Sequence, residues 1–201
     1  MSLKKDLELL YEIGCLRHVD RTWKQFHGLE VANVSEHTFR TIWMAMIIAK
    51  REGVGDIDKI IKMVLVHDLS ESRSVDAHYL SRQFVDRFED KALAESLEGT
   101  SVQELKELWE EFEKKETIEA KIAKDADVLD VDIEISELRA RGHKIADGWR
   151  ESREASSKKL FTNTAKEIFE ELQHSNPHDW HLNGSNRLNA GDWKPEESPN
   201  L

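Results

Sequence analysis

Apolar residues recur at helical spacing in two neighbouring stretches of the chain. In residues 56–68, which Asp56 can cap, they fall at i, i+3, i+4, i+7 and i+8, as Ile57, Ile60, Ile61, Val64 and Leu65. In residues 35–51, with Ser35 as the predicted cap, the same spacing is held by Phe39, Ile42, Trp43, Met46 and Ile47. Further apolar residues make this second helix apolar nearly all round, so we predict that it lies at the centre of the fold.

The remaining pattern predicts an all-α domain. Further helices are expected over residues 3–16, 79–97, 101–115, 117–141 and 155–174. No run alternates apolar and polar residues as a half-buried strand does. All three prolines follow the last of these helices. We therefore divide the chain into one helical domain, residues 1–175, and an irregular C-terminal tail, residues 176–201.

Charge and cysteine content narrow the partners and the compartment. The chain has 201 residues with 29 basic and 40 acidic side chains, a formal net charge of −11. This argues against a nucleic-acid polymer as partner, because phosphate contacts need basic surface. The single cysteine, Cys15, excludes an intramolecular disulfide and suits a reducing cytosol. Since the chain has neither a long apolar run nor the apolar segment of a signal peptide, we expect a cytoplasmic protein without a membrane partner.

Four ionisable side chains fall on faces that the apolar pattern buries. His67 and Asp68 end one apolar stripe, His37 lies on the inner side of the preceding helix, and Asp127 shares a face with alanines of a third helix; Asp125 is expected to point elsewhere. Buried carboxylates are costly unless a positive group compensates their charge. Two imidazoles and two carboxylates suit a catalytic divalent transition metal, although each residue alone also fits a satisfied core histidine or a solvated helix end.

The order of these groups along the chain carries a family resemblance. VSEH (34–37), LVHDLSE (65–71) and KDAD (124–127), with DRTW (20–23) before them, resemble the H…HD…D signature of the HD-domain metal-dependent phosphohydrolases. The most similar branch is that of the 5′-deoxynucleotidases and HD domain-containing protein 2. The resemblance covers roughly residues 5–172 and implies a helical HD domain.

The resemblance implies a metal-dependent phosphomonoesterase that removes the 5′-phosphate of (deoxy)nucleoside monophosphates. The metal ligands that it implies are His37, His67, Asp68 and Asp127. The cofactor would be one divalent ion, Mn²⁺, Co²⁺ or Fe²⁺, with Mg²⁺, Ni²⁺ or Zn²⁺ as alternatives. Glu71 and Asp76 match the pair that holds and polarises the attacking water, and a continuing helix would put Glu71 one turn beyond the first of the adjacent ligands. Arg21 and Trp23 match the residues that contact the nucleotide.

One departure and several alternatives accompany this resemblance. Val75 stands before Asp76 where the family usually has glycine, a residue that supplies turns which valine resists. A deoxynucleoside triphosphate triphosphohydrolase would use the same ligands, and a catalytically silent nucleotide-binding HD module or an all-α scaffold are further alternatives. The water-polarising carboxylates favour an enzyme. The resemblance also suggests a homodimer, with Trp180 and Trp193 of the tail as candidate contacts.

Overall fold

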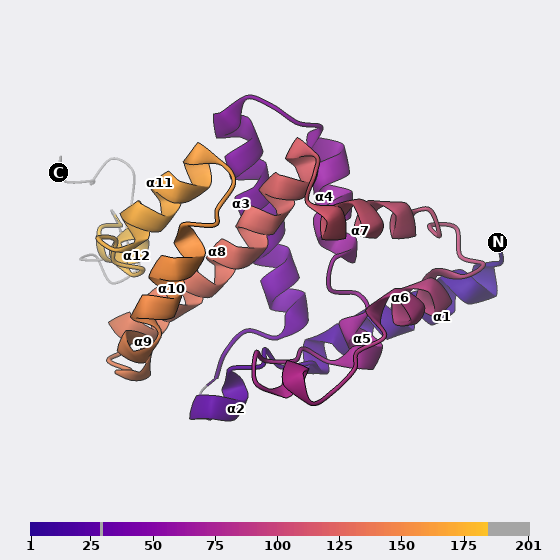
Figure 1. Cartoon of the computed structure of the whole chain (residues 1–201), viewed down its shortest axis with the longest axis horizontal. Helices are drawn as coiled ribbons and strands as arrows, with labels where there is room; N and C mark the ends of the chain where they lie inside the picture. Colours follow the sequence, from indigo (N-terminus) through magenta and orange to yellow (C-terminus); the bar gives the residue numbers. More distant parts are fainter. Residues whose placement is uncertain (29, 185–201) are drawn as a thin grey trace, which may run out of the picture.

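The computed structural model describes residues 1–28 and 30–184, and helices make up its regular structure (Figure 1). The longer helices are α1 (Leu3–Cys15), α3 (Val34–Glu52), α4 (Ile57–Val66), α6 (Glu89–Leu97), α7 (Leu105–Lys114), α8 (Ile118–Ala140), α10 (Arg150–Ser157) and α11 (Asn163–Leu172). The short ones are η1 (Leu16–His18), α2 (Lys24–His27), α5 (Glu71–Ser74), η2 (Ser81–Gln83), α9 (Ile145–Gly148) and α12 (Asp179–Leu182). Within these described ranges the only strand-like pairing is one isolated bridge, so the all-α prediction is confirmed.

Helices α3, α4 and α8 pack against one another at the centre of the molecule (Figure 1). Their apolar side chains form the main core, whose members include Met44, Ala45, Ile48, Ile60, Met63, Val64, Ile122, Ala123 and Leu129. A second cluster joins α1, α6 and α7 to this centre through Leu9, Val34, Val66, Leu93, Leu97 and Trp109. The two clusters meet where α3 begins and α4 ends, and this meeting point also carries the candidate site.

Side-chain caps fix where the three central helices begin. The Asn33 side chain accepts from the Glu36 N–H at 3.0 Å, and the Glu36 carboxylate accepts from the Asn33 N–H at 3.1 Å, a reciprocal capping box for α3. The predicted cap at Ser35 is therefore wrong, because α3 begins at Val34 and its cap is Asn33. Asp56 caps α4 as predicted, and Thr117 caps α8.

Helix α3 is central as predicted and buries the side that carries His37, but the prediction that its Phe39 and Trp43 side is also buried is wrong. Phe39, Trp43 and Ile47 are 66, 56 and 51% exposed. The buried side carries Met44 and Ile48 together with the smaller or polar residues His37, Thr41, Ala45 and Ala49. The physical reason is the position of the neighbours: α4 and α8 pack against this side, and their apolar side chains join Met44 and Ile48 in the main core. Leu65 of α4, also predicted to be buried, is 52% exposed.

Two predicted helices are shorter or broken in the structure. The segment predicted as helical from residue 79 is mostly loop up to Phe88, with η2 as its one regular turn, and α6 begins only at Glu89. Its apolar side chains Leu80, Phe84 and Phe88 recur at helical spacing but are 47, 79 and 71% exposed. The predicted helix over 155–174 is divided into α10 and α11, because Thr162 caps the second part by accepting from a backbone N–H.

The C-terminal part of the chain is described as far as residue 184. The helical turn α12 lies inside the region predicted to be irregular, while residues 185–201 of that predicted tail lie outside the described residues. Of the two tail tryptophans, Trp180 is 83% exposed and Trp193 is not described. None of the helices in the described ranges combines the length and hydropathy that a membrane span requires.

Candidate metal centre

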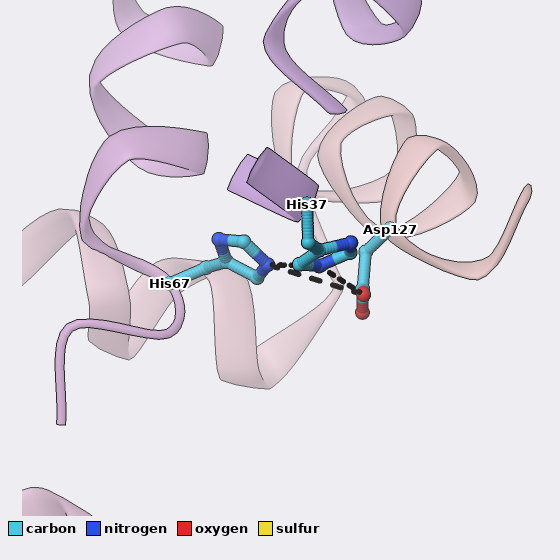
Figure 2. A group of neighbouring side chains, drawn as sticks. All are labelled: His37, His67 and Asp127. Atoms are coloured by element: carbon cyan, nitrogen blue, oxygen red, sulfur yellow. Dashed lines mark hydrogen bonds and ion pairs between the residues drawn. The ribbon is translucent and has the colours of Figure 1, made fainter. Parts of the chain in front are cut away.

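The three central helices bring two imidazoles and two carboxylates together. Figure 2 shows the side chains of His37 from α3, His67 from the end of α4 and Asp127 from α8 turned toward one another, with ligand atoms within 4.8 Å. The Nε2 atoms of the two histidines are 3.3 Å apart. Asp127 Oδ1 lies 3.3 Å from His37 Nε2, and Asp68 Oδ2 lies 3.4 and 3.2 Å from the Nε2 atoms of His37 and His67. The four groups predicted as ligands therefore share one centre.

Each histidine is oriented by a partner at Nδ1. His67 Nδ1 lies 2.6 Å from the Val64 carbonyl oxygen, which only accepts hydrogen bonds, so Nδ1 carries the proton and Nε2 a lone pair. His37 Nδ1 lies 2.6 Å from Asp130 Oδ2, which favours the same tautomer. When both imidazoles are neutral, two nitrogen lone pairs and two carboxylate oxygens converge on one point. Such a donor set needs a cation at its centre, and its mixed nitrogen and oxygen atoms fit a divalent transition metal.

The electrostatics of the centre follow from this crowding. Burial and the Arg21 charge disfavour the charged form of His37, but hydrogen bonds to Asp127, Asp130 and Asp68 outweigh them and raise the pKa of His37 well above its usual value. The site therefore attracts positive charge, and a proton competes with a metal ion for it. Metal affinity should accordingly fall as the pH is lowered, since the imidazoles must be neutral to ligate.

Asp130 is a residue of the centre that the sequence analysis did not single out. It is 1% exposed, and besides His37 it accepts a hydrogen bond from Arg40 Nε. Arg40 Nη1 in turn donates to Glu137 at 3.1 Å. Carboxylates of this kind orient metal-ligating imidazoles. A sequence signal was available, because Arg40 follows His37 by three residues and Asp130 follows Asp127 by three, which keeps both on the inner helix faces.

Glu71 lies beside the centre, although the helix that would carry it there is interrupted. Helix α4 ends at Val66, and α5 begins at Glu71 after a turn in which the Glu71 N–H donates to the Asp68 carbonyl at 3.0 Å. Within the described residues, the buried Oε2 of Glu71 has no hydrogen-bond partner. Burial, reinforced by the charges of Asp68 and Asp76, raises the pKa of Glu71 to about 9. A buried carboxyl group with one free oxygen beside a polar cavity is suited to bind a water molecule.

Arg21 and Asp76 join the same site. Arg21 is buried, with Nη1 3.3 Å from Asp68 Oδ2 and Nε 3.6 Å from Asp76 Oδ2, so it is not the surface cation that its sequence position also allowed. Asp76 also accepts from the Thr22 N–H at 3.0 Å. The preceding residue, Val75, has φ 56° and ψ 158°, a conformation that favours glycine. The departure from the family pattern therefore falls where the backbone makes a turn with positive φ.

Trp23 is placed differently from the other predicted site residues. Its Nε1 donates to Glu134 at 3.0 Å, and its ring lies 6.0 Å from that of Trp149. The Arg21 guanidinium lies 5.0 Å from the centre of the Trp23 ring. Trp23 does not contribute to the wall of the cavity beside the metal centre. It thus adjoins the site through Arg21.

A polar cavity of about 210 Å³ opens beside the four clustered groups. Its wall includes Glu71, Asp76 and Arg21 together with cations that the sequence analysis did not single out, namely Arg82, Arg87, Lys115 and Lys124. The larger cavities found among the described residues are not lined by His67, Asp68 or Asp127. The mixture of acidic and basic groups around a cation-binding centre suits a small anion.

Comparison with known proteins assigns the chain to a family. The family model described as HD domain matches residues 13–173, which include the whole metal centre. The chain belongs to the HD domain family. The 5′-deoxynucleotidase HDDC2 of Dictyostelium discoideum is 34% identical over 152 residues, covering 69% of this chain and 80% of that protein. The human protein of the same name is 31% identical over 145 residues, covering 69 and 70%.

Solved structures of similar proteins share the fold of this HD domain. PH0347 protein from Pyrococcus horikoshii OT3 matches with a TM-score of 0.70 and 25% identity over 84% of this chain and 98% of that one. A predicted metal-dependent phosphohydrolase from Magnetospirillum magnetotacticum MS-1 matches with a TM-score of 0.60 and 25% identity over 86 and 95%. These matches confirm the family predicted from the sequence motifs.

Two further acidic residues of the HD domain belong to its framework. Asp125 accepts from the Phe161 and Thr162 N–H groups at 2.9 and 2.8 Å and so holds the start of α11. Asp132 pairs with Arg153 at 2.7 Å. Both lie away from the metal centre, as predicted for Asp125, and both offer matched controls for the acidic residues within it.

Proposed function

We propose that this HD domain is a metal-dependent phosphomonoester hydrolase that removes the 5′-phosphate of deoxynucleoside monophosphates. The observation that carries the proposal is the convergence of four metal-type ligand groups, three of which line one polar cavity together with Glu71, whose Oε2 has no partner in the described residues. The names of two curated relatives, 5′-deoxynucleotidases, support the same substrate class.

In this proposal the four clustered groups, His37, His67, Asp68 and Asp127, hold one divalent ion. When bound, the ion would offset the charge of the phosphate and lower the pKa of a bound water. The mixed imidazole and carboxylate set favours Mn²⁺, Co²⁺ or Fe²⁺, with Mg²⁺, Ni²⁺ or Zn²⁺ as alternatives.

The chain's own residues divide the remaining work. Glu71 Oε2, which is buried and unpartnered, accepts a hydrogen bond from the attacking water and takes its proton as the new P–O bond forms. Asp76 helps to hold that water. The bond from phosphorus to the 5′-oxygen breaks, and the proton that Glu71 took passes to this oxygen, so that it leaves as the hydroxyl group of the nucleoside. Arg21, oriented by Asp68 and Asp76, presents a guanidinium to phosphate oxygens, and the Trp23 ring lies 5.0 Å from that guanidinium. Because a cation at the centre would counter the Asp68 charge, a bound metal would lower the pKa of Glu71 toward the range that a base needs.

The size of the cavity favours a monophosphate over a triphosphate. About 210 Å³ is smaller than the several hundred cubic ångströms that whole small-molecule ligands usually occupy, so it suits one phosphoryl group with the nucleoside outside. The triphosphohydrolase would need room for two further phosphates. The silent binding module gives no role to the unpartnered Glu71.

A homodimer and a cytoplasmic location complete the proposal. The exposed side of α3, with Phe39, Trp43 and Ile47, adjoins an apolar groove of about 540 Å³ that α1 and α4 help to line. A second copy would cover this apolar surface, which monomeric proteins rarely leave open. The single cysteine supports a reducing compartment.

The test is phosphate release from a panel of ribo- and deoxynucleoside mono- and triphosphates with Mn²⁺, Co²⁺ and Mg²⁺ in turn. We expect orthophosphate from deoxynucleoside monophosphates. Release of triphosphate from deoxynucleoside triphosphates would favour the alternative enzyme. Bound metal without turnover on any substrate would favour the silent module.

A further inference from the structure

The cations in the cavity wall differ in how fully the protein already engages them. Arg21 is held by two carboxylates. Arg82 donates to the Ala77 carbonyl at 2.6 Å, and Arg87 donates to the Val75 carbonyl at 3.1 Å and pairs with a neighbouring glutamate. Each of these three guanidinium groups is thus held by acceptors of the wall, although the Nε of Arg21 has no hydrogen-bond partner in the described residues.

Lys124 is engaged at one point and faces the cavity with the rest of its ammonium group. Its Nζ lies 2.7 Å from Asp127 Oδ2, while the other oxygen of Asp127 faces the two histidines. An ammonium group has three N–H donors, so two remain beyond this bond. The side chain is 31% exposed, and Lys124 lines the cavity together with Asp68 and Glu71.

The position of this ammonium group is fixed from two sides. Lys124 precedes Asp127 by three residues on α8, so both side chains leave the same helix face. The Nζ also lies 5.4 Å from the centre of the Phe112 ring, a cation–π distance. A lysine held in this way loses little conformational freedom when it binds a ligand, which favours a strong interaction.

We propose that Lys124 is a phosphate-binding residue, which donates to a terminal oxygen of the substrate's phosphoryl group. The inference rests on the proposed function and extends it. A phosphomonoester dianion beside the metal centre brings two negative charges close to Asp68, Asp127 and Glu71. A fixed ammonium group next to those carboxylates offsets part of that repulsion in the ground state and in the transition state.

The alternative is that Lys124 serves only to position Asp127 through their ion pair. The two roles differ in what is lost on substitution. Loss of a phosphate contact weakens phosphate binding at unchanged metal content, whereas loss of a positioning contact weakens metal binding first.

The experiment uses the full-length chain loaded with Mn²⁺, comparing wild type with Lys124→Met, which keeps the length of the side chain and removes its charge. Lys121→Met is the matched control, because Lys121 lies one turn earlier on α8 and does not line the cavity. Metal content is measured by elemental analysis, inorganic phosphate binding by calorimetry, and kcat and KM with a deoxynucleoside monophosphate.

We expect Lys124→Met to weaken phosphate binding by roughly 10- to 100-fold, the value of one charge-assisted hydrogen bond, with metal content near that of wild type and the control unchanged. Three results would each overturn the inference. Lys124→Met could bind phosphate as tightly as wild type, it could lose its bound metal, or the wild type could bind no phosphate. If Lys124→Met does not fold, Lys124→Gln carries the same test.

The calorimetric arm separates this inference from the proposed function. Wild type that binds phosphate but hydrolyses no nucleotide would refute the proposed activity, and the variant would still test Lys124. Wild type that hydrolyses nucleotides while both proteins bind phosphate equally would refute only the role of Lys124.

Discussion

The inner and outer faces of α3 each carry side chains that hydrophobicity alone would not place there. On the inner face His37 and Thr41 are fully buried, whereas on the outer face Phe39 and Trp43 are more than half exposed. The inner face has its polar groups satisfied by Asp130 and the metal centre, so their burial serves a ligand. On the outer face the apolar side chains of Phe39 and Trp43 are exposed, and this exposure is the basis for the proposed dimer interface. The two faces of one helix thus support two separate proposals, a metal site and a dimer interface.

The largest effect is expected from substitutions in the metal centre on the inner face of α3. Asp127→Ala removes a carboxylate that faces both histidines, so the protein should lose its bound metal and, with it, activity by about 10³-fold or more. The matched control is Asp125→Ala, which should retain metal but melt at a lower temperature, because Asp125 holds the start of α11. Elemental analysis and thermal melts measure both. Metal loss in the control but not in Asp127→Ala would contradict the assignment.

A second prediction separates catalysis from metal binding. Glu71→Gln keeps the shape of the side chain but cannot take a proton, so kcat should fall by about 10²–10⁴ while metal content stays near wild type. Glu98→Gln, at an exposed residue that ends α6, should leave kcat unchanged. Loss of metal in Glu71→Gln would instead make Glu71 a ligand.

A third prediction concerns the partner of His37. Asp130→Asn removes the carboxylate that orients the imidazole, so the dissociation constant for Mn²⁺ should rise by roughly 10- to 100-fold in calorimetry. Asp132→Asn should leave this constant unchanged, since Asp132 pairs with Arg153 away from the centre. Equal Mn²⁺ affinity in Asp130→Asn and wild type would show that Asp130 does not orient His37 for metal binding.

The outer face gives the smallest expected effect on chemistry. Replacing Phe39 and Trp43 together by serine should convert a dimer to a monomer in sedimentation, because exposed aromatic residues commonly dominate such interfaces. Metal content should not change. Trp180→Ser, in the described part of the tail, should leave the dimer intact. Dissociation by Trp180→Ser alone would assign the interface to the tail instead.

The sequence was sufficient to predict the helical class and the convergence of the site, for a physical reason. His37, His67 and Asp127 lie at positions that helical geometry turns inward, and polar residues there demand a partner whatever the exact packing. The outer face of α3 was wrongly predicted to be buried, because periodicity shows that residues share a face without showing what opposes it. Lys124 lies in the quoted KDAD motif but was not singled out, since its role depends on where Phe112 and the cavity lie.

The loop before α6 shows a second limit. Leu80, Phe84 and Phe88 satisfy helical spacing but are exposed. Val75, four residues before the predicted helix, has a positive φ, and such a backbone conformation does not continue the helix from α5. Sequence reasoning identified Val75 as a departure from the family pattern. The exposed loop that follows depends on tertiary contacts that spacing does not encode.

In the proposed function, a divalent ion held by the inner face of α3 and its neighbours makes this chain a phosphomonoesterase. The most direct measurement is phosphate release from a deoxynucleoside monophosphate by protein treated with a chelator, before and after titration with Mn²⁺. We expect no turnover by the chelated protein and full recovery of phosphate release when one Mn²⁺ is bound per chain. Equal turnover with and without chelator, or recovery without any bound metal, would contradict it.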